Sequence, residues 1–369
     1  MLEITRPTLL LDENKCKRNI QRMTAKAERL QVKLIPHMKT PQSVEVAGWC
    51  ANEGVTAITV SSLKMAEYFA KAGWKDITVA FPVNVLEIGV INELLQMGVD
   101  LKLFLLDEVV ARKLNDGLSQ PVKVLIELDA GYNRTGISTE NMEDIALLAQ
   151  TIVASDKLDL YGLYCHPGNT YQTHNIEEIR QIWAAAIRKM NLVRASLKAI
   201  QAELVVRMGD TPGCTLVEQM EGVDEISAGN FIFYDLVMNY LDVCNEEDIA
   251  VVMACPVVAK NSSRNEIIMH GGAVHFSKDH LFDEDQKKFF GEVVILAEDG
   301  WSPIIQGIRV KSLSQEHGVL LANDEIFDQI ETGDVLGILP IHSCLTANLM
   351  KSYTTLDGRK IDHMEKAMT

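Results

Sequence analysis

One lysine in the sequence stands where its amine could take part in a reaction. Lys39 lies in the segment PHMKT (36–40), at the end of an apolar, strand-like run at 32–36. An amine in that position is partly desolvated, and desolvation lowers its pKa toward the range in which it forms a Schiff base with an aldehyde. Taken alone, Lys39 also fits the commoner alternative, an exposed lysine that ends a strand.

Two glycine-rich segments could supply backbone N–H groups to an anion. They are GDTPG (209–213) and AGN (228–230), and each directly follows an apolar run. Amides in such turns can cradle a phosphate, although the same residues also make ordinary turns. A lysine together with two candidate phosphate loops indicates a phosphorylated cofactor that carries an aldehyde, which is pyridoxal phosphate.

A second set of reactive side chains lies near the end of the chain. His342 and Cys344 stand two positions apart in a segment that we expect to be extended. Both side chains therefore point to one face and can bind one ion. Imidazole and thiolate together suit Zn²⁺, and only two protein ligands leave the open positions of a catalytic site. The alternative is a buried cysteine beside a hydrogen-bonded histidine. The even spacing of His270, His275 and His280 could indicate a metal site, but it fits neither one helix face nor one strand face, which favours a surface cluster.

Eight apolar runs alternate with segments of helical composition in the first two thirds of the chain. The runs predicted as strands are 32–36, 57–61, 77–81, 101–106, 122–128, 160–165, 204–208 and 223–227. They are mostly continuous rather than alternating, as expected when helices cover a parallel sheet. Eight such units predict an α/β fold, a TIM-like (β/α)8 barrel with reactive groups at the C-terminal ends of its strands. A doubly wound open sheet would produce a similar pattern.

The pattern changes near residue 240, where short apolar runs follow one another without long helices. These runs are 251–259, 265–269, 292–297, 307–311, 318–321 and 335–339. Turn residues separate them, which predicts a mostly antiparallel β-domain. We therefore expect a barrel domain at 1–240, whose first residues could join the second domain, and a β-domain at 241–369 that carries the metal pair.

Composition narrows the class of protein. The 369 residues include 35 Lys+Arg and 51 Asp+Glu, a net charge of −16, which argues against binding to nucleic acid or an anionic membrane. Neither a membrane-spanning run nor a signal-peptide layout is expected from the sequence. The seven cysteines are scattered without a CxxC motif and predict reduced thiols in a cytoplasmic protein. These properties favour an enzyme that acts on small molecules.

With these residues in view, the chain resembles the pyridoxal-phosphate enzymes of fold type III, in particular the branch of D-serine dehydratases and D-threonine aldolases. The resemblance runs nearly end to end, and its specificity lies in the joint order and spacing of short motifs. These are RPTLLLD (6–12), PHMKT (36–40), DAGYNRTG (129–136), YCHPGNTY (164–171), MGDTPG (208–213), SAGNFIFYD (227–235) and HSCLT (342–346).

The resemblance implies a role for each matching residue. Lys39 corresponds to the Schiff-base lysine that also acts as acid and base at Cα. The residues implied for the rest of the cofactor are Arg134 near its phenolic oxygen, His166 and Tyr171 beside it, and Thr211, Gly229 and Asn230 at its phosphate. His342 and Cys344 correspond to the metal pair of D-serine dehydratases, whereas D-threonine aldolases typically have Asp at the second place.

The resemblance implies a dehydratase, dependent on pyridoxal phosphate and Zn²⁺ or another divalent metal, that turns a D-β-hydroxy amino acid into a keto acid and ammonia. D-serine and D-threo-3-hydroxyaspartate are the candidate substrates, and a homodimer is the implied assembly. The alternatives are a D-threonine-type aldolase, an amino-acid racemase, and a non-enzymatic cofactor carrier. The HSC motif and the extra β-domain argue against the carrier.

Overall fold

The computed structural model describes residues 2–365, which form two compact units. One, the barrel unit, consists of residues 21–39 and 50–229; the other, the sheet unit, consists of residues 2–20, 40–49 and 230–365. Helices α1 (Glu13–Arg29) and α2 (Val44–Asn52) contribute residues to both. The predicted domain boundary near residue 240 stays a prediction.

The barrel unit is built on eight parallel strands that close into a ring. In spatial order they are β2 (Lys33–Leu34), β10 (Glu225–Ile226), β9 (Val205–Met208), β8 (Leu158–Cys165), β6 (Val122–Asp129), β5 (Asp100–Leu105), β4 (Asp76–Pro82) and β3 (Ala57–Val60), with β7 (Ile137–Ser138) beside β6. A parallel bridge between His37 and Thr59 joins the segment after β2 to β3 and completes the ring. The TIM-like barrel is thus confirmed, and the open sheet is excluded by this bridge.

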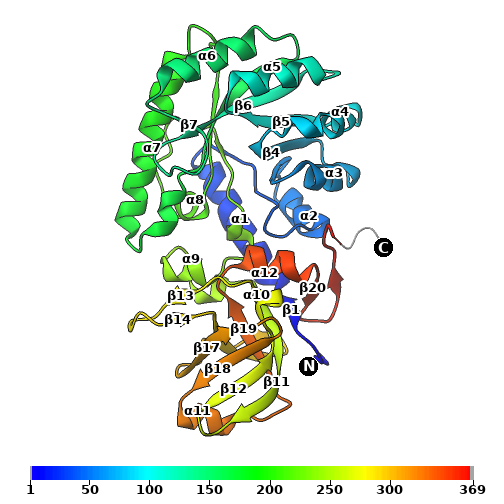
Figure 1. Ribbon diagram of the computed structural model, residues 1–369, viewed down its shortest axis with the longest axis vertical. Helices are drawn as coiled ribbons and strands as arrows, with labels where there is room; N and C mark the ends of the chain where they lie inside the picture. Colours follow the sequence, from blue (N-terminus) through cyan, green and yellow to red (C-terminus); the bar gives the residue numbers. More distant parts are fainter. Residues whose placement is uncertain (1, 366–369) are drawn as a thin grey trace. The chain divides into compact units, whose positions relative to one another are not determined.

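Helices cover the outside of the barrel between successive strands (Figure 1). They are α3 (Leu63–Lys71), η1 (Val85–Glu87), α4 (Ile88–Gln96), α5 (Glu108–Gly117), α6 (Met142–Val153), η2 (Gly168–Gln172), α7 (Ile176–Ser196) and α8 (Thr211–Leu216). Polar side chains cap their first turns: Ser62 accepts the Met65 amide at 3.2 Å and Asp107 accepts the Val110 amide at 2.8 Å. Such caps satisfy N–H groups that a helix start leaves unpaired.

Charged side chains lie inside the barrel near the end where its strands begin. Arg207 is fully buried, and its Nε donates to Glu225 Oε2 at 2.7 Å. Its Nη1 donates to Thr78 Oγ1 at 2.6 Å, and Tyr161 Oη donates to Glu225 Oε1 at 2.7 Å. The two buried charges are therefore both paired and hydrogen-bonded, which is the condition for keeping them inside a protein.

Replacing Arg207 with Met is expected to lower the free energy of unfolding by about 3–5 kcal/mol, because Glu225 would remain buried without its cation. Urea titration followed by circular dichroism measures this loss. The matched control is Arg112→Met, since the Arg112–Glu108 pair is exposed and its loss should change stability by less than about 0.5 kcal/mol. Equal stability losses in the two variants would contradict a structural role for the buried pair.

The sheet unit is built on a mostly antiparallel ten-stranded sheet. Its spatial order is β12 (Glu266–His270), β18 (His317–Ala322), β17 (Ile308–Leu313), β15 (Gly291–Ala297), β19 (Val335–Pro340), β11 (Val251–Asn261), β1 (Thr8–Leu11), β20 (Tyr353–Thr355) and β21 (Lys360–Ile361), with β16 (Gly300–Trp301) beside β15. All six predicted runs are strands, and the antiparallel prediction is confirmed. The N-terminal strand β1 pairs antiparallel with β11 and parallel with β20.

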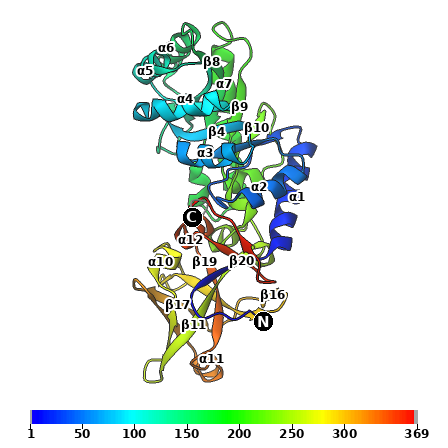
Figure 2. The same ribbon diagram turned by 90° about the vertical axis from the view of Figure 1, so that its right-hand side faces the viewer.

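Short helices and one hairpin complete the sheet unit. They are η3 (Asn230–Ile232), α9 (Leu236–Tyr240), η4 (Glu246–Asp248), α10 (Ala273–Phe276), α11 (Asp324–Gln329), α12 (Ser343–Met350) and the hairpin of β13 (Leu281–Phe282) and β14 (Lys288–Phe289). Helices α10 and α12 lie together at one end of the sheet, and α11 lies at the other (Figure 1 and Figure 2). None of the seven cysteines, all of which lie in the described part of the chain, forms a disulfide. Among the described residues, no helix has the length and apolar character needed to span a membrane.

Candidate active site

Lys39 stands at the C-terminal end of the first barrel strand. The backbone beyond β2 stays in the sheet, because the amides of Ile35 and His37 donate to the carbonyls of Ile226 and Ala228, each at 2.8 Å. The Lys39 side chain itself is exposed. Of the two interpretations of Lys39, the exposed lysine at the end of a strand agrees with the structure, and the reactive role of its amine stays a prediction.

Two imidazoles near this end of the barrel, the buried His37 and the half-buried His166, experience a positive field. Burial lowers the pKa of His37 well below its usual value, and the charge of Lys39 lowers it further. Burial and the charge of Arg134 lower the pKa of His166 to about 3. Both imidazoles are therefore neutral at pH 7, and the positive charges of Lys39 and Arg134 that lower their pKa values also favour an anion at this place.

Arg134 lies in a turn that Asp129 organises. The carboxylate of Asp129 accepts the amides of Gly131 and Tyr132, each at 2.8 Å, and that of Asn133 at 2.9 Å. The guanidinium carbon of Arg134 lies 5.7 Å from the centre of the Tyr132 ring, within the range of a cation–π contact. The motif DAGYNRTG thus forms a side-chain-stabilised loop that presents an exposed arginine.

The structure brings three of the predicted cofactor residues together. Tyr171 Oη accepts the backbone amide of Thr211 at 3.0 Å, and His166 Nδ1 contacts the carbonyl oxygen of Gly209. The loops after β8 and β9 are therefore joined through His166, Tyr171 and Thr211. Gly229 is buried at the end of the barrel unit, after β10.

Asp210 fixes the loop after β9, and sequence reasoning did not single it out. Its buried carboxylate accepts the Gly213 amide at 2.6 Å and the Thr170 hydroxyl at 3.0 Å, and it contacts the Trp183 indole nitrogen. Burial raises the pKa of Asp210 to about 6. A Cβ on Gly213 would lie 1.7 Å from Trp183 Nε1, so only glycine fits. An Asp followed by Thr-Pro is a helix-start signal that could have identified it.

In the sheet unit, the side chain of Asn230 contacts the HSC segment. Asn230 Nδ2 donates to Asp235 Oδ2 at 2.6 Å, to Ser343 Oγ at 3.2 Å and to Cys344 Sγ at 3.6 Å. Asp235 Oδ2 also accepts the Ser343 amide at 2.9 Å. Within the described residues, Asn230 Oδ1 is buried without a hydrogen-bond partner, so the site holds an acceptor that a bound donor could satisfy.

His342 and Cys344 lie together, but not in the extended segment that the sequence predicted. Strand β19 ends at Pro340 and α12 begins at Ser343, so His342 is the N-cap residue and Cys344 lies in the first helical turn. Their contact therefore comes from the strand-to-helix turn and not from strand alternation. Burial alone lowers the pKa of His342, but hydrogen bonds with Asp279 and Cys344 outweigh burial and raise it to about 11.

Two further residues contact this pair. Asp279 Oδ2 lies 2.9 Å from His342 Nδ1, and Thr40 Oγ1 lies 3.1 Å from Cys344 Sγ. Thr40 was visible in the motif PHMKT, but no signal in the sequence marked Asp279, which stands in a loop 63 residues before its partner. A carboxylate on the second nitrogen of a histidine is the usual support of a metal-binding imidazole.

Comparisons with known proteins agree with this geometry. Residues 11–236 match the family described as "Alanine racemase, N-terminal domain", and residues 250–356 match the "Putative serine dehydratase domain". Together with the closed barrel, these matches place the chain in the fold type III class of pyridoxal-phosphate enzymes. Because the first match covers more than half of the sequence, the chain belongs to the alanine racemase N-terminal domain family.

Similar individual proteins are dehydratases and aldolases. The chain is 29% identical to D-threo-3-hydroxyaspartate dehydratase of Delftia sp. (strain HT23), over 96% of this chain and 95% of that protein. The solved structure of that enzyme superposes with a TM-score of 0.90 at 27% identity, covering 98% of this chain and 97% of the other. D-serine dehydratase of Dictyostelium discoideum is 26% identical over 95% and 93% of the two chains. D-threonine aldolase from Filomicrobium marinum shares the fold, with a TM-score of 0.82 at 20% identity over 98% and 96%.

Proposed function

We propose that this chain is a pyridoxal-phosphate-dependent dehydratase of a D-β-hydroxy amino acid, D-threo-3-hydroxyaspartate or D-serine, and that it forms a keto acid and ammonia. The observation that carries this proposal is the contact between the imidazole of His342 and the thiol of Cys344. Solved structures of D-threo-3-hydroxyaspartate dehydratase include a histidine-to-alanine mutant and a metal-free cysteine-to-alanine mutant, whose substituted residues stand two positions apart, as His342 and Cys344 do.

The barrel residues fit the cofactor. Lys39 would hold its aldehyde carbon and Arg134 would face its phenolic oxygen, and the positive field on His37 and His166 suits a molecule with a phosphate and a phenolate. We assign the phosphate to the backbone at Thr211, Gly229 and Asn230, because the Asn230 side-chain amide already donates to Asp235. When bound, pyridoxal phosphate supplies a sink for the electron pair left at Cα.

The donor set of the HSC segment fits a divalent metal. His342 and Cys344 would hold it, and such an ion supplies a Lewis acid where a hydroxyl group must leave, since hydroxide is a poor leaving group at neutral pH. Thr40 contacts the thiol and Asp279 contacts the imidazole. Both contacts lie within the sheet unit.

The protein's own side chains have separate roles in the proposed reaction. Lys39, once its amine is free and neutral, accepts the proton from Cα of the substrate. The low pKa of His166 keeps that imidazole neutral at pH 7, so it adds no competing proton donor beside the substrate. Loss of the β-hydroxyl as water, followed by hydrolysis, releases the keto acid and ammonia. An aldolase would remove the hydroxyl proton instead and break the Cα–Cβ bond.

A substrate panel separates these outcomes. The cofactor- and Zn²⁺-loaded protein is incubated with D-serine, D-threonine and D-threo-3-hydroxyaspartate, and ammonia, keto acid, glycine and aldehyde are measured for each. The dehydratase predicts ammonia and keto acid in equal amounts, with L-serine as the inactive control. Glycine with aldehyde and without ammonia would replace the proposal by the aldolase. Loss of optical activity without net turnover, unaffected by chelation, would identify a racemase.

Replacing Asp279 with Asn is expected to weaken metal binding by about 10–100-fold, because the imidazole of His342 would lose its anionic support. Activity should return when metal is raised to saturation, which separates a positioning role from a direct role in the reaction. The control is Asp285→Asn, because Asp285 is an exposed partner of Lys287 outside this site. Equal metal affinity in the Asp279 variant and the wild type would refute the assignment.

Two further parts of the proposal rest on the resemblance alone. We propose that the chain forms a homodimer and that it works in the cytoplasm. Sedimentation velocity of the cofactor-loaded protein tests the first, since the proposal predicts about twice the mass of one chain. Microscopy or fractionation of the producing cell tests the second, and a secreted or membrane-bound protein would contradict it.

A further inference from the structure

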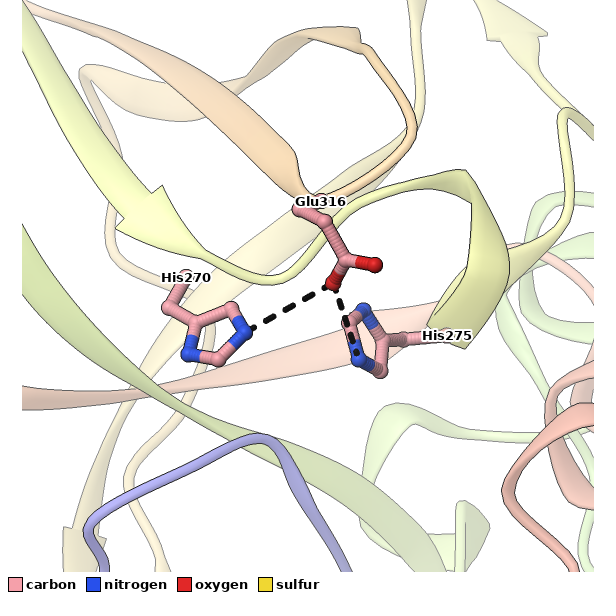
Figure 3. Close-up of side chains that lie close together, drawn as sticks. All are labelled: His270, His275 and Glu316. Carbon is pink, nitrogen blue, oxygen red and sulfur yellow. Dashed lines mark ion pairs between the residues drawn. The ribbon is translucent and has the colours of Figure 1, made fainter.

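The sheet unit brings together three more metal-ligating side chains, and none of them belongs to the HSC segment. His270 ends β12, His275 lies in α10 and Glu316 lies in the turn between β17 and β18. One ligand atom from each lies within 4.8 Å of the other two. Figure 3 shows both imidazole rings beside the Glu316 carboxylate, whose Oε2 is 3.6 Å from His270 Nε2 and 3.8 Å from His275 Nε2.

The backbone holds these side chains in place. The amide of Gly271 donates to the carbonyl of Glu316 at 2.9 Å, and the amide of Ala273 donates to the carbonyl of Ser314 at 2.7 Å. A Cβ on Gly272 would lie 2.3 Å from a backbone oxygen of the same turn, so glycine permits the close approach. The loop after β12 and the turn after β17 are therefore joined before any ligand binds, which favours binding because little ordering remains to be done.

We propose that His270, His275 and Glu316 form a second metal site that takes a divalent transition metal of the zinc class. Two imidazole nitrogens and one carboxylate oxygen are a common ligand set for Zn²⁺, with water at the fourth position of a tetrahedral shell. The set contains no thiolate, and a site composed mainly of imidazoles also suits Cu²⁺ and Ni²⁺. Side-chain exposures of 40% for His270, 15% for His275 and 51% for Glu316 leave the site open to an ion from solution.

The imidazole of His275 is neutral, but metal binding would change its tautomer. Its Nδ1 accepts the Gly272 amide at 3.1 Å, which requires a neutral imidazole, the form that binds metals. The remaining ring proton is then on Nε2 and faces Glu316. A metal at Nε2 would move the ring proton to Nδ1, so the ring would exchange one hydrogen bond from Gly272 for a metal bond. Faster hydrogen exchange of the Gly272 amide in the presence of Zn²⁺ is therefore expected.

The consequence of metal binding would be local. The ion would clamp the loop after β12 to the turn after β17, and that loop continues through α10 to Asp279, which contacts His342. The second site is thus placed to stiffen the segment that supports the first pair without sharing a ligand with it. Zn²⁺ binding at His270, His275 and Glu316 is independent of the proposed enzymatic reaction and can be tested apart from it.

The test measures Zn²⁺ binding to the full-length, pyridoxal-phosphate-loaded protein by calorimetry and by elemental analysis after dialysis. The wild type is expected to bind two ions per chain, and the variant His270→Asn with Glu316→Gln is expected to bind one. Loss of two ligands should weaken the second site by more than about 100-fold, since disturbing a supporting residue alone costs 10–100-fold. The variant His342→Ala with Cys344→Ala should keep this ion and lose the other.

The matched control is His280→Asn, which removes an imidazole from the same loop but outside the group. Zn²⁺ binding is also measured for the single variant His275→Asn, which leaves His270 and Glu316 in place. Circular dichroism checks that each variant is folded. Zinc binding at this site is overturned if the folded His342/Cys344 double variant binds no Zn²⁺ below millimolar concentration. It is also overturned if His270→Asn with Glu316→Gln binds as many ions as the wild type.

Discussion

Replacing Lys39 with Ala is expected to lower turnover by at least about 10³-fold, because the chain would lose its proposed base and its covalent hold on the cofactor together. A positioned acid–base group alone accounts for about 10²–10⁴-fold. Formation of keto acid from the preferred D-amino acid, at saturating substrate and cofactor, measures the effect. The visible absorption of the lysine-bound cofactor should disappear from the same variant.

Borohydride reduction of the wild type followed by peptide mapping gives an independent readout, in which the label should fall on the peptide that contains PHMKT. The matched control is Lys33→Ala, because Lys33 stands in β2 of the same strand segment and pairs with Asp76 at 3.4 Å at the opposite end. The control should keep turnover within about twofold, as expected for an exposed ion pair. Label on another lysine, or a Lys39 variant with near-normal turnover, would remove the proposed mechanism.

Replacing Cys344 with Ala is expected to lower dehydration by about 10³-fold while the lysine-bound cofactor keeps its absorption. The physical reason is that a Lewis acid contributes several kcal/mol when hydroxide must leave, and one of the two proposed metal ligands would be gone. Ammonia release and metal content per chain are measured on the same preparation. Loss of ammonia release together with one bound ion per chain, with an unchanged cofactor spectrum, separates the metal pair from the cofactor site.

Cys244→Ser is the control, because Cys244 is a half-buried thiol of the same unit. It should leave metal content and turnover unchanged. Unchanged ammonia release by the Cys344 variant would contradict the assignment of the metal to this pair, even if the cofactor results were as expected. Loss of cofactor absorption in that variant would instead indicate that Cys344 supports the cofactor and not a metal.

Much of the fold was predictable from local patterns. The continuous apolar runs at 32–36 through 223–227 all became parallel strands, and the short runs after residue 240 became antiparallel ones. Periodicity and turn residues report on each segment by itself, so they reveal strand type and order. Closure of the ring was not visible, because it depends on the bridge between His37 and Thr59, which no local pattern encodes.

The candidate site, too, was predictable only in part from the sequence. Lys39, Arg134, His166, Tyr171 and Thr211 were visible because they stand in compact motifs, and the structure joins three of them through the loops after β8 and β9. The contacts of Asp279 with His342 and of Glu316 with His270 and His275 were not predictable, since the partners lie far apart in the sequence and meet only when the sheet has folded.

By itself, therefore, the sequence determined the element types, the two kinds of sheet and the chemical identity of the reactive side chains. The tertiary structure decided which of those side chains meet. It placed His342 and Cys344 on a strand-to-helix turn where the sequence predicted an extended segment, and it left Lys39 exposed, which was one of the two possibilities that the sequence left open. The physical reason is the sequence distance over which each effect acts. The spacing of apolar residues and helix capping depend on residues close together in the sequence, whereas burial and side-chain contacts depend on segments far apart in it.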